Sequence, residues 1–194
     1  MEIRKQLQEN MRRSIEAKSR FLEDARRVEV FVKSVSVVVE SYFRGGRLFI
    51  AGNGGSAADA QHLAAEFVSK LARDRNPLPA EALTTDTSIL TAIGNDYGFE
   101  HVFARQLLGK ANPNDVFLGI TTSGRSVNII RAVQACTRLG IPSIVFSGRD
   151  GGDVASLCDY CVIATGELTS TIQEVHIVLA HTLCGAVEQA VFPE

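Results

Sequence analysis

Five short apolar segments recur along this chain, and their spacing constrains its fold more than any other feature. They occupy residues 47–51, 80–84, 115–120, 142–147 and 160–164. Stretches with helical character lie between and after them, at residues 56–72, 87–93, 99–109, 126–139, 151–157 and 171–190. Short apolar strands that alternate with helices are typical of a parallel sheet covered on both faces. The sequence therefore predicts an α/β protein, a three-layer α/β/α sandwich with a five-stranded parallel sheet of Rossmann-like class.

The first 45 residues precede the first apolar segment and differ from the rest. They contain neither glycine nor proline before Gly45, which predicts two helices, at residues 1–28 and 29–43. A chain of 194 residues has the length of one domain. We therefore expect a single domain, with a helical extension over residues 1–45 and an α/β core over residues 46–194.

Composition argues against several functional classes. The formal net charge is -2 and the basic residues are scattered, which argues against nucleic acid as a partner. The charged N-terminal residues do not resemble a secretory leader, and no apolar run has the length of a membrane span. The four cysteines lie in apolar surroundings, and Cys158 and Cys161 form a lone C-x-x-C without a second pair. This pattern favours buried structural thiols in a reducing cytoplasm over a disulfide framework or a zinc site.

A glycine-rich turn follows the first apolar segment and is formed by Gly52, Asn53, Gly54, Gly55 and Ser56. Backbone N–H groups of such a turn, at the start of a helix, can hold a phosphate or another anion. The turn also fits the dinucleotide fingerprint G-x-G-x-x-A. That fingerprint requires an acidic residue at the end of the second strand, and Asp86 lies too far along the chain. Dinucleotide binding is therefore a weaker hypothesis than phosphate binding.

A second polar turn follows the third apolar segment and favours a phosphate site. Thr121, Thr122, Ser123 and Ser126 place four hydroxyls around Gly124 just before a helix. Hydroxyls and backbone N–H groups together can hold a phosphate without lysine. Ser126 alone would be enough to cap the helix, so capping does not account for the other three hydroxyls.

Two pairs of polar residues have helical spacing. His62 and Glu66 are four residues apart, and Gln173 and His181 are eight apart on a helix that is otherwise apolar. Each pair therefore shares one face of its helix. If the two helices converge, these four side chains would form a nitrogen and oxygen site of the kind that binds catalytic zinc. We expect His101 and His176 to be ordinary core residues.

Three further residues are candidates for supporting roles. Asn95 and Asp96 are expected in a polar loop after a short helix, where Asp96 could reach a substrate hydroxyl. Asp59 lies one turn before His62. It could orient the imidazole of His62, or it could stabilise the dipole of its own helix.

Together these motifs resemble the phosphosugar isomerase (SIS) domain family, and within it the phosphoheptose isomerases. The likeness covers essentially the whole chain. It rests on Ala51–Ser56, Asp59–Glu66, Leu90–Asp96, Thr121–Ser126 and Ile172–His181.

The resemblance implies a SIS-type fold, a homotetramer assembled through the N-terminal helices, and one Zn²⁺ per site. The implied zinc ligands are His62, Glu66, Gln173 and His181. The implied substrate contacts are Asn53, Gly54, Gly55, Ser56, Glu66, Asn95, Asp96, Thr121, Thr122, Ser123, Ser126 and Gln173. Two positions depart from the family pattern: Thr121 replaces a serine and keeps the hydroxyl, and Lys70 replaces an arginine and loses its bidentate fork.

The implied reaction converts sedoheptulose 7-phosphate to D-glycero-D-manno-heptose 7-phosphate through an enediol, the first step toward activated heptose for lipopolysaccharide or a related surface glycan. Glu66 would be the base at C1 and His181 the acid that opens the sugar ring. Because both are also implied zinc ligands, either the metal acts as a Lewis acid or the ligands exchange during turnover. The alternative function is a non-catalytic regulator of the same fold, like the DnaA initiator-associating protein. That relative resembles a version of the family without the equivalents of Glu66 and His181, both of which this chain retains.

Overall fold

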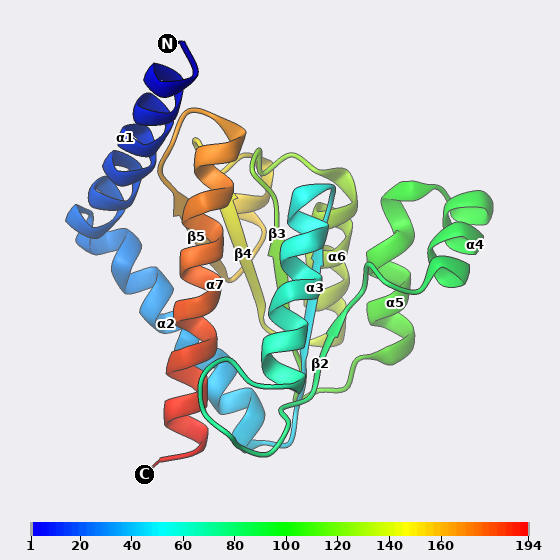
Figure 1. The fold of residues 1–194 in the computed structure, drawn as a ribbon. Coiled ribbons are helices and arrows are strands. Elements are labelled where there is room, and N and C mark those ends of the chain that lie inside the picture. Colours follow the sequence, from blue (N-terminus) through cyan, green and yellow to red (C-terminus); the bar gives the residue numbers. More distant parts are fainter. Residues whose placement is uncertain (1, 194) are drawn as a thin grey trace.

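The computed structural model describes residues 2–193 and contains one parallel sheet of five strands in the order β2-β1-β3-β4-β5. The strands are β1 (Leu48–Gly52), β2 (Ala80–Ala82), β3 (Val116–Ile120), β4 (Ser143–Gly148) and β5 (Tyr160–Ala164). All four neighbouring pairs are parallel, and Figure 1 shows helices in front of and behind the sheet. The predicted fold class is therefore confirmed, and the strand ends lie within two residues of the expected ones.

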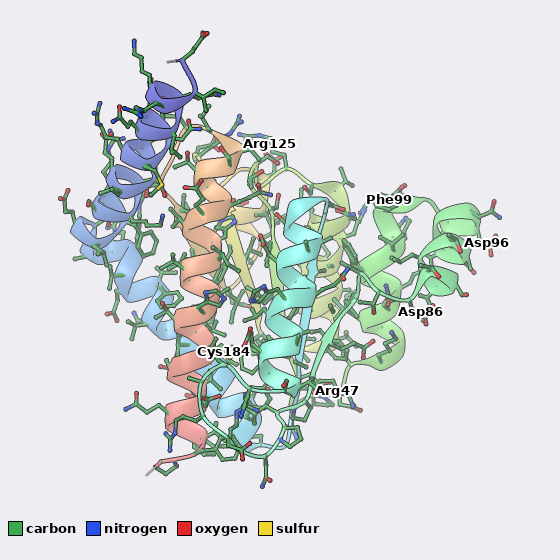
Figure 2. All side chains as sticks on the ribbon, in the orientation of Figure 1. Arg47, Asp86, Asp96, Phe99, Arg125 and Cys184 are labelled. Carbon is green, nitrogen blue, oxygen red and sulfur yellow. The ribbon has the colours of Figure 1, made fainter. Side chains whose placement is uncertain are left out.

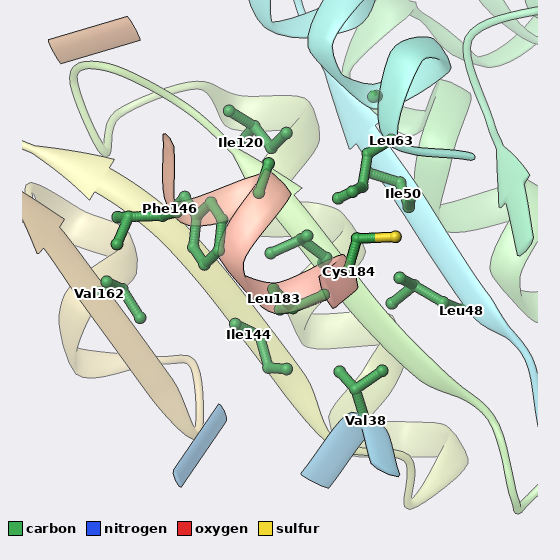
Figure 3. Close-up of a cluster of buried hydrophobic side chains, with 14 of the residues drawn as sticks. Val38, Leu48, Ile50, Leu63, Ile120, Ile144, Phe146, Val162, Leu183 and Cys184 are labelled. Carbon is green, nitrogen blue, oxygen red and sulfur yellow. The ribbon is translucent and has the colours of Figure 1, made fainter. Parts of the chain in front are cut away.

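Alternate residues of the strands face two separate apolar cores. Leu48 and Ile50 of β1 belong to the core under the helices α1 (Glu2–Glu23), α2 (Ala25–Phe43), α3 (Gly55–Val68) and α7 (Thr169–Val191). Figure 3 shows this core, in which Leu183 and Cys184 of α7 lie over side chains from the strands. Phe49 and Ala51 face the second core, formed with α5 (Val102–Lys110) and α6 (Val127–Leu139). This alternation follows from the two-residue period of a strand.

The first helix ends earlier than the sequence pattern predicts. The expected boundary between residues 28 and 29 is wrong, since α1 ends at Glu23 and α2 begins at Ala25. Asp24 causes the break, because its carboxylate accepts hydrogen bonds from the backbone N–H groups of Arg26 and Arg27. Such a side-chain cap begins a new helix without glycine or proline.

The central helices also differ from expectation. Helix α4 (Thr87–Tyr97) is four residues longer than predicted, and the stretch expected at residues 99–109 begins as a 3₁₀ helix, Phe99–His101. The expected helix at residues 151–157 is only a 3₁₀ turn, Asp153–Ser156. Among residues 2–193 no helix has both the length and the hydropathy needed to cross a membrane.

Candidate active site

The two predicted anion loops lie side by side, because they follow the neighbouring strands β1 and β3. The side chains of Asn53 and Asn128 join the two loops. Nδ2 of Asn53 donates to Oδ1 of Asn128 at 2.9 Å, and Nδ2 of Asn128 donates to Oδ1 of Asn53 at 2.8 Å. Asn128 is buried near the start of α6, and sequence reasoning overlooked it. The only hint of this role in the sequence is that Asn128 is a polar residue just after the hydroxyl-rich turn.

The hydroxyl-rich loop at the end of β3 leaves its helix without a side-chain cap. Ser126 is the N-cap residue of α6, but its hydroxyl makes no capping hydrogen bond and lies 3.1 Å from the Thr121 hydroxyl. The loop turns at Gly124, whose φ of +65° favours glycine. A Cβ at Gly124 would lie 1.9 Å from the carbonyl oxygen of Gly151, so the loop after β4 presses directly on this turn. The arrangement leaves hydroxyls and the positive end of α6 at the carboxyl edge of the sheet, which suits an anion.

Arg125 projects from this loop but is already paired. Its guanidinium donates to the carboxylate of Asp150, with the shorter contact at 2.7 Å, and to the carbonyl oxygen of Ser123. The hydrogen bond from Arg125 holds the pKa of Asp150 below its usual value, and the same bond raises the pKa of Arg125. Arg125 therefore braces the loop against the turn after β4 in this conformation.

Helices α3 and α7 lie next to each other and run in the same direction, as Figure 1 shows. Near their N-terminal ends, the side chain of Gln173 lies against Gly55, where a Cβ would be 2.4 Å from Nε2. Farther along, Nε2 of His181 lies 3.1 Å from Nε2 of His62. The same nitrogen of His62 lies 3.2 Å from Oε1 of Glu66. The structure thus brings together His62, Glu66 and His181, which the sequence placed only on two separate helices.

The donor set of this cluster suits a metal ion. One ligand atom from each of His62, Glu66 and His181 lies within 4.8 Å of the other two. Tetrahedral zinc with bonds of about 2.0–2.2 Å separates its ligands by about 3.3 Å, close to the two distances above. If Nε2 of His62 carries a proton, it can donate that proton to His181 or to Glu66, but not to both at once. A cation would instead bind a lone pair from each of the three side chains. The side chain of His62 is half exposed, so the cluster is open to solvent.

Gln173 lies on the same helix as His181, nearer its N-terminal end. It precedes His181 by eight residues, or about 12 Å along a helix axis. Its contact with Gly55 instead places it near the carboxyl ends of the strands, beside the glycine-rich turn. The expected roles of Gln173 as a zinc ligand and as a substrate contact both stay predictions.

Asn95 and Asp96 also lie apart from the cluster. The prediction of a loop is wrong, because both residues are in the last turn of α4, which has no buried residues. Asp86 caps the start of this helix, and the guanidinium of Arg105 lies 3.6 Å from the ring centroid of Tyr97 at its end. Figure 2 shows Asp96 at the outer edge of the molecule, on the helix farthest from α7.

Asp59 lies beside His62 without orienting it. One carboxylate oxygen, Oδ2, is buried and has no hydrogen-bond partner among the described residues. Burial raises the pKa of Asp59, and the nearby His62 partly offsets that effect. The expected hydrogen bond from His62 to Asp59 is therefore absent from the described part of the chain, and Asp59 is not in the first turn of α3 that would favour a helix-dipole role.

The remaining histidines and cysteines differ from one another in burial. His176 is a core residue as expected, and Nε2 lies 2.8 Å from the carbonyl oxygen of Ser147. His101 is half exposed at the surface, so its expected place in the core is wrong. Cys136 and Cys184 are buried, whereas Cys158 and Cys161 are only half buried, which corrects the expectation for that pair.

Comparisons with known proteins agree with this geometry. The family model described as "SIS domain" matches residues 3–148. A phosphoheptose isomerase from Aneurinibacillus thermoaerophilus is 48% identical over 96% of this chain and 94% of the relative. The solved structure of a phosphoheptose isomerase from Neisseria gonorrhoeae is 39% identical, covers 96% of this chain and 99% of its own, and superposes with a TM-score of 0.90. A phosphoheptose isomerase structure from Francisella tularensis is 32% identical, covers 97% and 100% of the two chains, and has a TM-score of 0.92. This chain therefore belongs to the SIS domain family and, within it, to the phosphoheptose isomerases.

Proposed function

We propose that this protein interconverts sedoheptulose 7-phosphate and D-glycero-D-manno-heptose 7-phosphate. One observation carries the proposal: His62, Glu66 and His181 converge between α3 and α7, in a chain that belongs to the phosphoheptose isomerases. The reaction would be the first step toward an activated heptose for a surface glycan, in the cytoplasm. The geometry of the two loops supports a substrate with an anionic group at one end.

The hydroxyl-rich loop suits the phosphate, and the cluster suits the reacting carbons. His62 lies seven residues into α3 from Gly55, which corresponds to about 10 Å along the helix. A substrate with its phosphate on C7 and its chemistry at C1 and C2 has these two ends separated by an open carbon chain. Phosphate binding by Thr121, Thr122, Ser123 and Ser126 would then hold the reacting carbons in place. We assign Asn53, Gly54, Gly55, Ser56 and Gln173 to the walls of the same substrate site.

His62, Glu66 and His181 would hold Zn²⁺ and leave its fourth position open, as catalytic zinc sites do. When bound, zinc would supply Lewis acidity toward the oxygens that become negatively charged during the reaction. Glu66 takes a proton from C1 while the C2 oxygen gains one, which gives the enediol. The C1 hydroxyl then loses its proton and C2 gains one, which gives the aldose. His181 would move the protons between the oxygens, which requires its Nε2 to leave the metal during turnover.

Turnover in D₂O tests the proposal, with mass spectrometry of the sugar phosphate and NMR of the product. The intact protein should incorporate deuterium and form the aldose, and Glu66→Gln should do neither while still binding substrate through the phosphate loop. Full turnover by Glu66→Gln would exclude Glu66 as the base. Absence of exchange by the folded, zinc-loaded protein would refute the isomerase and favour the regulatory alternative.

The oligomer is a separate part of the proposal. Helix α1 exposes Ile3, Leu7, Met11, Ile15 and Leu22, with Ile3 at 81% and Leu22 at 74% exposure. Residues at these spacings form a continuous apolar stripe along one face of a helix. A stripe of this kind suits contact with further copies of the chain, as expected for a homotetramer. Light scattering of Leu7→Lys beside the unaltered protein would measure the change in mass, and an unchanged tetramer would exclude this contact.

A further inference from the structure

Arg75 anchors the C-terminal end of the helix that carries His62 and Glu66. It lies in the segment that follows α3 and folds back under that helix. Its Nη2 donates to the backbone carbonyl of Glu66 at 2.9 Å, and its Nη1 donates to that of Phe67 at 2.7 Å. The last carbonyls of a helix have no partners within the helix and carry partial negative charge, so a guanidinium there is stabilising. Arg75 therefore fixes the backbone of Glu66 itself.

Glu188 attaches the same guanidinium to the other helix. Its Oε2 accepts from Nε of Arg75 at 2.9 Å, and its Oε1 accepts from the backbone N–H of Arg73 at 3.0 Å. The side chains of Arg75 and Glu188 are only 3% and 2% exposed. Burial raises the pKa of Glu188, but the hydrogen bonds from Arg73 and Arg75 outweigh it and lower the pKa overall. The carboxylate is thus fully paired, and the pair joins α3 to α7 away from water.

Arg75 and Glu188 lie farther toward the C-terminal ends of the same two helices than the proposed metal cluster does. Glu188 follows His181 by seven residues, or two turns, so both side chains are on the same face of α7. Glu66 is in the last two turns of α3, and its own backbone carbonyl is one of the two that Arg75 holds. The contacts of Gln173 with Gly55 and of His181 with His62 therefore follow one another along α3 and α7. The contact of Glu188 with Arg75 continues the series just beyond the end of α3.

We propose that Arg75 and Glu188 are positioning residues that set the separation and rotation of α3 against α7, and thereby hold Glu66 and His62 at the distance from His181 that a divalent cation requires. This inference rests on the proposed function for the identity of the metal. Neither residue belongs to the ligand set or to the substrate loops. A buried ion pair is a poor source of stability, because desolvation offsets most of the attraction. Its contribution to geometry is therefore the property to measure.

The test compares zinc affinity in variants that keep the protein folded. Arg75→Met combined with Glu188→Met removes both charges together and leaves no unpaired ion. Arg75→Lys keeps a charge for Glu188 but lacks the fork that reaches the carbonyls of Glu66 and Phe67. The matched control is Lys110→Met with Glu81→Met, which removes another partly buried pair, far from α7 on α5 and β2. Zinc affinity is measured by competition with a chromophoric chelator, the absorption spectrum of bound Co²⁺ reports geometry, and circular dichroism reports folding.

We expect zinc binding to weaken about tenfold or more in the Met pair and in Arg75→Lys, as for other residues that support metal ligands. The Co²⁺ spectrum should change with it, while the control pair keeps wild-type values. Wild-type zinc affinity and Co²⁺ spectrum in a folded Met pair would overturn the inference. If the Met pair fails to fold, Arg75→Lys decides by the same criterion, and failure of both to fold would show a purely structural role.

The experiments distinguish failure of the isomerase proposal from failure of the positioning role. A wild-type protein that binds zinc but does not turn over heptose phosphate would refute the activity and leave the positioning role measurable. Zinc binding that is unaffected by His181→Ala would show that the metal binds elsewhere, and would overturn the role of Arg75 and Glu188 as well.

Discussion

Buried His176 should make the folded protein less stable in mild acid. The residue is 1% exposed, and burial lowers its pKa to about 4, although the hydrogen bond to Ser147 partly opposes the shift. The contact with the Ser147 carbonyl needs Nε2–H, which leaves Nδ1 as the unpaired nitrogen among described residues. Protonation of Nδ1 would place an uncompensated charge in the core. The folded state therefore favours the neutral ring.

The direction and size of the effect follow from linkage. The folded pKa of about 4 lies below the ordinary value of 6.5, so the unfolded chain binds more protons between these pH values. The contribution of His176 is fully present above pH 6.5 and is lost as the pH falls toward 4. The difference between the two pKa values corresponds to about 3 kcal/mol of unfolding free energy. Below pH 4 both states carry the proton, and this group adds no further dependence.

Urea unfolding at fixed protein concentration, followed by circular dichroism between pH 4 and pH 8, measures this loss. His176→Gln keeps a donor for Ser147 but cannot titrate, so about 3 kcal/mol of the pH dependence should disappear. His101→Gln is the matched control, and it should keep the wild-type slope because His176 is still present. An unchanged slope in His176→Gln, or an NMR titration of His176 near pH 6.5, would refute the reasoning.

Three loop variants test the proposed phosphate site. Ser123→Ala should raise KM about tenfold or more with kcat little changed, because a hydrogen bond to a charged group contributes about 1.5–3 kcal/mol. A fall in kcat alone in steady-state kinetics would contradict that assignment. Gly124→Ala should lower the melting temperature and raise KM, since a positive φ costs alanine about 1–2 kcal/mol and its Cβ would meet the Gly151 carbonyl. Asn128→Ala should reduce the unfolding free energy by about 1–3 kcal/mol, because it leaves the Asn53 amide unpaired. An unchanged denaturation midpoint would show that this amide pair is dispensable.

The strands and their loops could be predicted because their signals are local. Each strand is an apolar run, and the parallel topology places the turns after β1 and β3 at the same edge of the sheet. Some helix boundaries were harder. Asp24 divides two helices without glycine or proline. The start of α4 after Asp86 was predicted, but its end was not, because the helix continues through Asn95 and Asp96 as far as Tyr97.

The cluster of His62, Glu66 and His181 could be predicted only as two separate parts. Helical spacing places His62 beside Glu66, but His62 and His181 are 119 residues apart in sequence. Their approach depends on how α3 packs against α7, which involves Arg75 and Glu188, and the sequence analysis identified neither. The sequence did offer one signal for Glu188: a glutamate on an otherwise apolar helix, two turns after His181. The structure shows that this glutamate is buried.

The two halves of the proposed site therefore depend on different parts of the structure. The phosphate loops are fixed by strand order and by contacts among nearby turns, such as that of Gly124 with Gly151. We expect the cluster to depend on the packing of α3 against α7, which touch at Gly55 and are linked again through Arg75 and Glu188. Changes in the loops should alter KM with zinc affinity preserved, and changes at Arg75 or Glu188 should alter zinc affinity with phosphate binding preserved. Measuring both quantities in both sets of variants would separate these contributions, and parallel losses in every variant would show that the site behaves as a single unit.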